Sequence, residues 1–166
     1  MNTRSLPVLF LIALLATSII LPAPVRAEDA LKKARPDIYD ESADAAQQVA
    51  TALTQAGQEH KHVLLQFGAN WCIWCHRLHE LCASNPEIAA FVKTNYVVVL
   101  VNVNQGRNQA TDDKYGNPTH LGLPALVVLD ATGKQLATQD SGKLEEGDHH
   151  SPAKVLAFLK KWAPQH

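Results

Sequence analysis

The segment Phe67-Gly-Ala-Asn-Trp-Cys-Ile-Trp-Cys-His76 places two cysteines, Cys72 and Cys75, three residues apart. An apolar run of strand length, 62–67, precedes it, and a helical pattern over 76–83 follows. Two thiols spaced in this way on the first turn of a helix can form a disulfide with little backbone movement. The free N–H groups and the positive dipole end at the start of that helix would stabilise a thiolate on the first cysteine. Because the thiolate is the form that attacks a disulfide, the segment indicates redox chemistry.

Half of a structural zinc site is the other interpretation of this cysteine pair. Such a site needs two more ligands at matching spacing. The chain has three cysteines, the third is Cys82, and there is no second Cys-x-x-Cys pair. The redox interpretation is therefore favoured.

The rest of the chain predicts alternating helices and strands. Apolar residues at three- and four-residue steps predict a helix over 42–56, with Gly57 as its stop. Asn85 and Pro86 are typical N-cap and first-turn residues of a helix that reaches about Thr94. The other expected elements are a strand over 96–103, a loop over 104–118 with a helical turn at 112–115, hairpin strands over 125–129 and 135–138, a charged loop over 142–150 and a last helix that starts at Ser151-Pro152. This order predicts a parallel pair and then an antiparallel hairpin, with helices on both faces of the sheet.

The chain resembles the thioredoxin superfamily over about Lys61–Trp162. The matching features are the strand 62–67, Trp71-Cys72-Ile-Trp-Cys75, the strand 96–103, Gly122-Leu123-Pro124 before the strand 125–129, the turn Asp130–Lys134 and a closing amphipathic helix. The Trp-Cys-x-Trp-Cys-His form is similar to a group of thioredoxin-like proteins rather than to ordinary thioredoxin, which has Gly-Pro between its cysteines. The resemblance implies an α/β thioredoxin-like fold, with a central mixed sheet built from a βαβ and a ββα unit.

The resemblance also implies a thiol–disulfide oxidoreductase with Cys72 and Cys75 as its catalytic residues. Cys72 is expected to be the attacking, partly exposed thiol, and Cys75 the buried resolving thiol. Pro124 is expected to be a cis proline that faces the dithiol. A cis bond there would expose the backbone of Leu123 to a substrate peptide, which could pair with it as an added strand.

Aromatic and ionisable residues flank the two thiols. Trp71 is expected to shield Cys72, and Trp74 to offer an apolar docking surface, although either ring could instead be a packing residue. A large ring between two catalytic thiols cannot be fully buried, which favours docking for Trp74. A protonated His76 would lower a thiolate pKa, and the alternative for it is an exposed helix histidine.

Two positions depart from the thioredoxin pattern. Gln66 occupies the place where many thioredoxins carry a buried acid, and Leu100 aligns near the lysine that often pairs with that acid. A glutamine cannot titrate, so it cannot be the base that deprotonates Cys75. Water or a nearby side chain such as Glu80 would then have to take that proton.

Metal binding is the rival function. The residues Cys72, Cys75, His76, His79 and Cys82 form a stripe on the expected helix that could hold zinc or copper. A buried packing role for Cys82 is favoured over this, so no metal site is assigned. Asp148-His149-His150 is interpreted as part of a solvated loop.

The first 27 residues have the pattern of a secretory signal peptide. Arg4 is followed by an apolar run over 8–21 and by Val25-Arg26-Ala27, a small-residue cleavage site. The expected product is a single domain over 28–166, with a polar lead-in over 28–41, exported to the bacterial periplasm. A formal net charge of −1 gives no indication of nucleic-acid binding.

The expected partners are protein thiols and disulfides, together with a membrane-bound redox protein that recycles the dithiol. No cofactor is expected beyond the redox-active disulfide Cys72–Cys75. The direction of the reaction depends on the reduction potential and on the recycling partner, which the sequence does not reveal.

Overall fold

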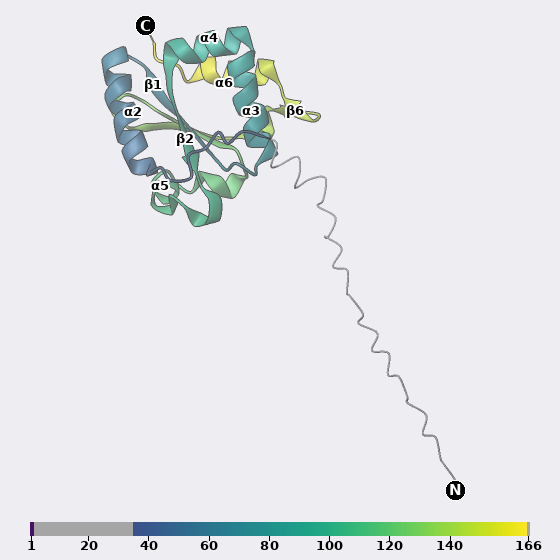
Figure 1. Ribbon diagram of the computed structural model, residues 1–166. Helices are drawn as coiled ribbons and strands as arrows, with labels where there is room; N and C mark the ends of the chain where they lie inside the picture. The colour runs from purple at the N-terminus through teal and green to yellow at the C-terminus, as the bar shows by residue number, and fades with distance from the viewer. Residues whose placement is uncertain (2–34, 166) are drawn as a thin grey trace. The chain divides into compact units, whose positions relative to one another are not determined.

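The computed structural model describes Met1 and residues 35–165, and contacts group the chain from Arg35 onward into one compact unit (Figure 1). The expected signal peptide lies outside the described residues, apart from Met1. The helices and strands of the described part are α2 (Ala45–Glu59), β1 (His62–Gly68), α3 (Ile73–Ser84), α4 (Pro86–Asn95), β2 (Tyr96–Asn102), α5 (Gln109–Lys114), β3 (Ala125–Leu129), β4 (Gln135–Asp140), β5 (Glu145–Glu146), β6 (His149–His150) and α6 (Pro152–Lys161). Among them, no helix is both long and apolar enough to cross a membrane.

A four-stranded mixed sheet with the order β2-β1-β3-β4 forms the centre of the unit. β1 pairs in parallel with β2, from His62 opposite Tyr96 to Gly68 opposite Asn102. β3 pairs antiparallel with both β1 and β4. The expected parallel pair and antiparallel hairpin are therefore confirmed, and with them the α/β fold class.

Apolar side chains of the strands alternate between two cores, one on each face of the sheet. Val63, Leu65 and Phe67 of β1 pack in the core under α2, whereas Leu64 packs in the core formed with α3, α4 and α6. Figure 1 shows α2 on one side of the sheet and α4 and α6 on the other. β1 is thus buried on both faces, as the apolar run predicts.

The expected capping residues predict the start of α4 correctly but not the end of α2. Asn85 caps α4 by accepting the N–H groups of Glu87 and Ile88, each at 3.1 Å, and Pro86 is the first residue, as expected. α2 instead continues through Gly57, because His60 takes the left-handed conformation and its N–H bonds to the carbonyl of Ala56. The predicted stop at Gly57 is wrong by three residues, because the helix ends at Glu59 rather than at Ala56.

Two segments predicted as loops have regular structure. In the first, where a helical turn was expected at 112–115, α5 covers 109–114 and a 3₁₀ turn, η2, covers Pro118–Leu121. Buried Asp112 ties these together by accepting the backbone N–H and hydroxyl of Thr119. In the second segment, a 3₁₀ turn, η3 (Ser141–Leu144), leads into the small hairpin β5–β6. In both segments an aspartate side chain accepts a backbone N–H group, that of Thr119 for Asp112 and that of Gly142 for Asp140. Bonds of this kind leave no apolar periodicity in the sequence from which the turns could be predicted.

The lead-in is not wholly polar. Tyr39 is 2% exposed and belongs to a third apolar cluster, here called the dithiol cluster, together with Cys72 and Cys75. Its neighbours in that cluster are the partly buried Ile38, Trp74, Leu100 and Leu123. The lead-in therefore completes the surroundings of the two cysteines.

Candidate functional site

Cys72 and Cys75 are joined by a disulfide at the N-terminus of α3, with their Cα atoms 5.3 Å apart. Cys72 is the N-cap residue of this helix, and its Sγ accepts the backbone N–H of Cys75 at 3.1 Å. An N-terminal amide that points at a sulfur favours the negative charge of a thiolate there. The helix therefore gives Cys72 an electrostatic environment suited to a leaving or attacking thiolate.

Both cysteines are buried in this disulfide form. Cys75 is fully buried, as expected, but Cys72 is only 5% exposed, so the expectation of a partly exposed Cys72 is wrong for the oxidised protein. The cover comes from apolar side chains of distant segments, among them Ile38 of the lead-in and Leu123. Burial of this kind depends on which segments meet in the fold, and a motif alone cannot reveal it.

The Leu123–Pro124 peptide bond is cis, as the resemblance implied. Pro124 is buried at the start of β3, and Leu123 is partly buried against the dithiol cluster. Gly122 precedes them with a φ of 105°, a conformation that a residue with a Cβ rarely adopts. Leu123 thus packs beside the two cysteines.

The two tryptophans of the motif have different surroundings. Trp71 is 53% exposed, and its indole N–H donates to the side-chain oxygen of Asn104 at 3.1 Å. Trp74 is half-buried between the ring of His150, in an edge-to-face arrangement at 5.3 Å, and the guanidinium of Arg77, 4.7 Å above its ring. Trp71 thus presents more free ring surface than Trp74, which is fixed by its two neighbours.

Asn70 ties the lead-in to the motif. Its side-chain oxygen accepts the backbone N–H groups of Ile38 and Tyr39, at 3.0 and 2.9 Å, and its amide N–H donates to the carbonyl of Tyr39. Its own carbonyl accepts a hydrogen bond from Nε2 of His76 at 2.8 Å. Through this hydrogen bond, the His76 side chain stabilises the loop before Cys72.

Gln66 occupies the position where many thioredoxins carry a buried acid. The residue is buried here too, with 4% of its surface exposed. Its Nε2 donates to the hydroxyl of Tyr39 at 2.8 Å and to the carbonyl of Cys75 at 3.2 Å. Leu100 lies opposite Gln66 in the β1–β2 pair and packs in the dithiol cluster. The ion pair that many thioredoxins have here is replaced by an amide and an apolar side chain.

Glu80 does not lie in the dithiol cluster. It is exposed on α3 and lines a groove of about 390 Å³ that also involves Arg77 and residues 148–150. The structure thus places Glu80 beside the β5–β6 hairpin.

His150 is buried, which corrects the interpretation of 148–150 as a solvated loop. It is 2% exposed, and neither ring nitrogen has a hydrogen-bond partner among the described residues. Burial, together with the charges of Arg77 and His149, lowers the pKa of His150 to about 4. The alternation of strand β6 explains the difference, because it turns His149 outward and His150 toward Trp74.

Cys82 and the histidines of the stripe do not converge. Cys82 is a free cysteine that packs beside the core of α3, α4 and α6, and burial raises the pKa of its thiol to about 11. Over the residues that the structure describes, no three His, Cys, Asp or Glu side chains are arranged to hold a metal ion.

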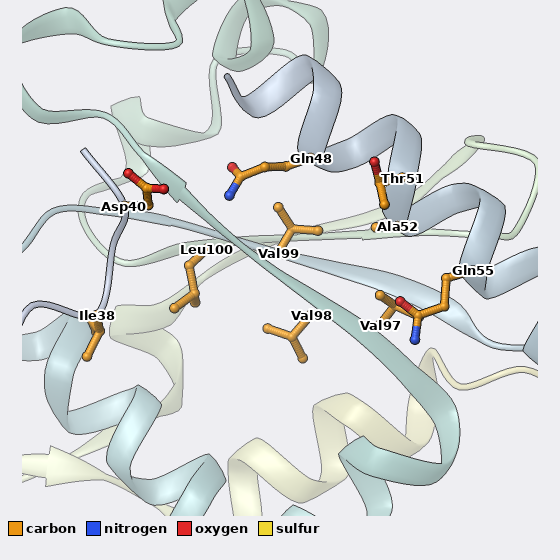
Figure 2. A pocket seen from close by; sticks show the side chains of 10 residues that line it. All are labelled: Ile38, Asp40, Gln48, Thr51, Ala52, Gln55, Val97, Val98, Val99 and Leu100. Atoms are coloured by element: carbon orange, nitrogen blue, oxygen red, sulfur yellow. The ribbon is translucent and has the colours of Figure 1, made fainter. Parts of the chain in front are cut away.

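One surface hollow lies apart from the cysteines. It has a volume of about 460 Å³ and lies between α2 and the edge strand β2, with Ile38 and Asp40 at one end (Figure 2). Its walls are residues 97–100 of β2 and the polar face of α2, notably Gln48 and Gln55. Neither thiol lines it, so we place the candidate site at the disulfide.

The contributions of three residues to the site, Tyr39, Asn70 and His150, were not predicted from the sequence. Tyr39 and Asn70 lie 31 residues apart, and only the fold reveals their contact. His150 stands in a charged segment whose burial depends on a two-residue strand. For Tyr39 and Ile38 a signal did exist, since two adjacent large apolar residues stand out in a mostly polar lead-in.

Comparisons with known proteins agree with this geometry. A family model described as thioredoxin-like matches residues 44–131. A crystal structure titled as a disulphide isomerase from Xylella fastidiosa Temecula1 is 36% identical, covers 77% of this chain and 98% of its own, and superposes with a TM-score of 0.69.

Two curated relatives match a shorter part of the chain. The disulfide bond reductase DsbH of Chlamydia pneumoniae is 33% identical over 95 residues, which are 53% of this chain and 57% of the relative. The thiol:disulfide interchange protein DsbD of Vibrio vulnificus (strain CMCP6) is 34% identical over 86 residues, which are 51% of this chain and 14% of the relative. The matched part thus spans less than two thirds of either relative.

Proposed function

The chain belongs to the thioredoxin-like family, and we propose that it acts as a thiol–disulfide oxidoreductase through Cys72 and Cys75. The observation that carries the proposal is the N-cap position of Cys72, whose sulfur accepts the N–H of Cys75 at 3.1 Å while Cys75 is fully buried. This difference in surroundings gives the two sulfurs different roles. The stabilised sulfur is the one that exchanges with a partner, and the buried sulfur completes the exchange.

In the reducing direction, the Cys72 thiolate attacks one sulfur of a substrate disulfide. A bond forms between Cys72 and that sulfur, and the other substrate sulfur departs with the electron pair. Cys75 then attacks Cys72, the Cys72–Cys75 bond forms, and the second substrate sulfur departs. The substrate is reduced by two electrons, and the protein is oxidised by two. The same steps in reverse oxidise a dithiol.

The substrates proposed are protein disulfides and thiols rather than small molecules. The dithiol lies outside the hollow between α2 and β2, beside Leu123 and the exposed ring of Trp71. An extended peptide could pair with the backbone at Leu123-Pro124 and rest on Trp71 and Trp74. The three relatives, named for disulfide reduction, interchange and isomerisation, support this class of substrate.

Export and a membrane-bound redox partner complete the proposal. The signal pattern over 1–27 supports cleavage after Ala27 and a periplasmic location. An exported reductase needs electrons from across the membrane, so a membrane donor is the partner proposed. Mass spectrometry of the protein from its native envelope should find Glu28 at the N-terminus, whereas Met1 or Asn2 there would contradict export.

Catalysed reduction of insulin by dithiothreitol tests the activity. The parent protein is expected to accelerate the reaction, and Cys72→Ser to leave it at the uncatalysed rate. Cys82→Ala is the matched control, because it removes a thiol that packs outside the dithiol cluster, and it should stay within a few-fold of the parent. A parent protein no faster than Cys72→Ser would overturn the proposed function.

A further inference from the structure

The buried resolving cysteine lacks the carboxylate that many thioredoxins place beneath it. Gln66 stands at that place, and the dithiol cluster that surrounds Cys75 is completed by Ile38, Leu100 and other apolar side chains. A thiolate on Cys75 would be formed in apolar surroundings, which disfavour charge. Some polar group must offset this cost if Cys75 is to attack or to depart as a thiolate.

The hydroxyl of Tyr39 is held in one orientation by Gln66. The carbonyl of Cys75 can only accept a hydrogen bond, so the nitrogen end of the Gln66 amide must face it. The same nitrogen lies 2.8 Å from the Tyr39 hydroxyl, whose oxygen therefore accepts. The single proton of that hydroxyl remains to be donated, and it is donated to no other described residue.

Gly68 shows how close the Tyr39 hydroxyl lies to the Cys75 sulfur. A Cβ at Gly68 would lie 2.2 Å from Oη of Tyr39 and 2.6 Å from Sγ of Cys75. The hydroxyl oxygen and the sulfur therefore lie within about 4.8 Å of each other, on the side of Gly68 where another residue would carry its side chain. Tyr39 is 2% exposed, and burial raises the pKa of its hydroxyl, so the group keeps its proton. It can serve as a hydrogen-bond donor but not as a base.

We propose that Tyr39 donates its hydroxyl hydrogen bond to the sulfur of Cys75 whenever that sulfur is a thiolate, in place of the missing acid. The role rests on the proposed oxidoreductase function and adds to it the group that tunes the resolving thiol. Asn70 holds Tyr39 in place through bonds to both its backbone N–H and its carbonyl. Residue 39 thus reaches the site from a segment far from the motif.

The hydrogen bond acts in the second step of the exchange. The Cys75 thiolate attacks Sγ of Cys72 in a mixed disulfide, the Cys72–Cys75 bond forms, and the bond from Cys72 to the partner sulfur breaks. The partner sulfur leaves with the electron pair and takes up a proton equivalent to the one that Cys75 lost. Tyr39 keeps its own proton throughout, so it lowers the energy of the thiolate without exchanging a proton.

Tyr39→Phe in the full chain tests the role, with oxidised glutathione as the probe. Acid quenching and mass spectrometry follow the reduced protein, the Cys72–glutathione mixed disulfide and the Cys72–Cys75 disulfide over time. We expect the first step to be unchanged and the second to be about three- to tenfold slower, because a lost bond to the thiolate raises the Cys75 pKa while increasing its nucleophilicity less. The midpoint of the pH profile of the second step should move to higher pH.

Tyr96→Phe is the matched control, since it removes a buried hydroxyl that bonds to the carbonyl of Leu159, in the core on the α6 side. It should leave both steps and the pH profile unchanged. Gln66→Met, which frees the Tyr39 hydroxyl but keeps the volume, should also slow the second step selectively, and it serves if Tyr39→Phe does not fold.

The outcomes separate the two proposals. A second step within twofold of the parent, or an equal slowing of both steps, would overturn the role of Tyr39 and leave the oxidoreductase proposal intact. A parent protein that forms no mixed disulfide at Cys72 would overturn the oxidoreductase proposal itself.

Discussion

Cys75→Ser is expected to accumulate covalent mixed disulfides with its substrates, whereas Cys72→Ser is expected to form none. In the first variant the attacking thiolate at the start of α3 remains, and the sulfur that would release the substrate is gone. In the second, the remaining thiol is fully buried and lies beneath its neighbour. Loss of the nucleophile should also lower the rate of disulfide exchange by about three orders of magnitude or more.

Non-reducing electrophoresis and mass spectrometry of the two variants, purified from cells after the thiols are blocked with acid and alkylating agent, provide the measurement. Cys82→Ala in each background shows whether any adduct is carried by the third cysteine, which should carry none while the protein is folded. Equal adduct yields from Cys72→Ser and Cys75→Ser would reverse or abolish the assigned roles.

Gly68→Ala is expected to have the largest effect on stability among conservative changes near the site. The added methyl group would overlap the Tyr39 hydroxyl and the Cys75 sulfur, at 2.2 and 2.6 Å. Both groups are buried and fixed, one by Gln66 and Asn70 and the other by the disulfide, so neither can move aside easily. Overpacking of this kind lowers the free energy of unfolding by about 1–3 kcal/mol.

Gly57→Ala is the matched control, because a Cβ there meets nothing within 4 Å and the residue lies within α2. It should raise the free energy of unfolding by about 0.5–1 kcal/mol, as alanine replaces glycine in a helix. Urea unfolding of both oxidised variants measures the difference. If the Gly68→Ala variant were as stable as the parent, then Tyr39 and Cys75 would be freer to move than their contacts indicate.

The sequence was sufficient for the fold and for the two thiols because their signals are local. A strand before Cys-x-x-Cys and a helix after it can be read from neighbouring residues, and Pro124 before an apolar strand completes the resemblance. Gln66 could be located for the same reason, since its position relative to Cys72 is fixed by the strand.

The surroundings of the dithiol could not be predicted in this way. Tyr39 is held near Cys75 by hydrogen bonds with Asn70 and Gln66, and no periodic pattern in the sequence connects these positions. The burial of Cys72 likewise depends on Ile38 and Leu123, which lie far from each other in the sequence. His150 is buried by a hairpin that is too short to have a strand pattern of its own. In each case, tertiary contact rather than local propensity sets the environment of the side chain.

The equilibrium of the purified protein with glutathione buffers of graded potential tests the central claim most directly. Mass spectrometry of peptides after acid quenching would report the oxidation state of Cys72, Cys75 and Cys82 separately. We expect one reversible transition in which Cys72 and Cys75 are oxidised together into a disulfide, with Cys72 as the site of any glutathione adduct and Cys82 unchanged. Independent oxidation of Cys72 and Cys75, or glutathione found mainly on Cys75 or Cys82, would contradict it.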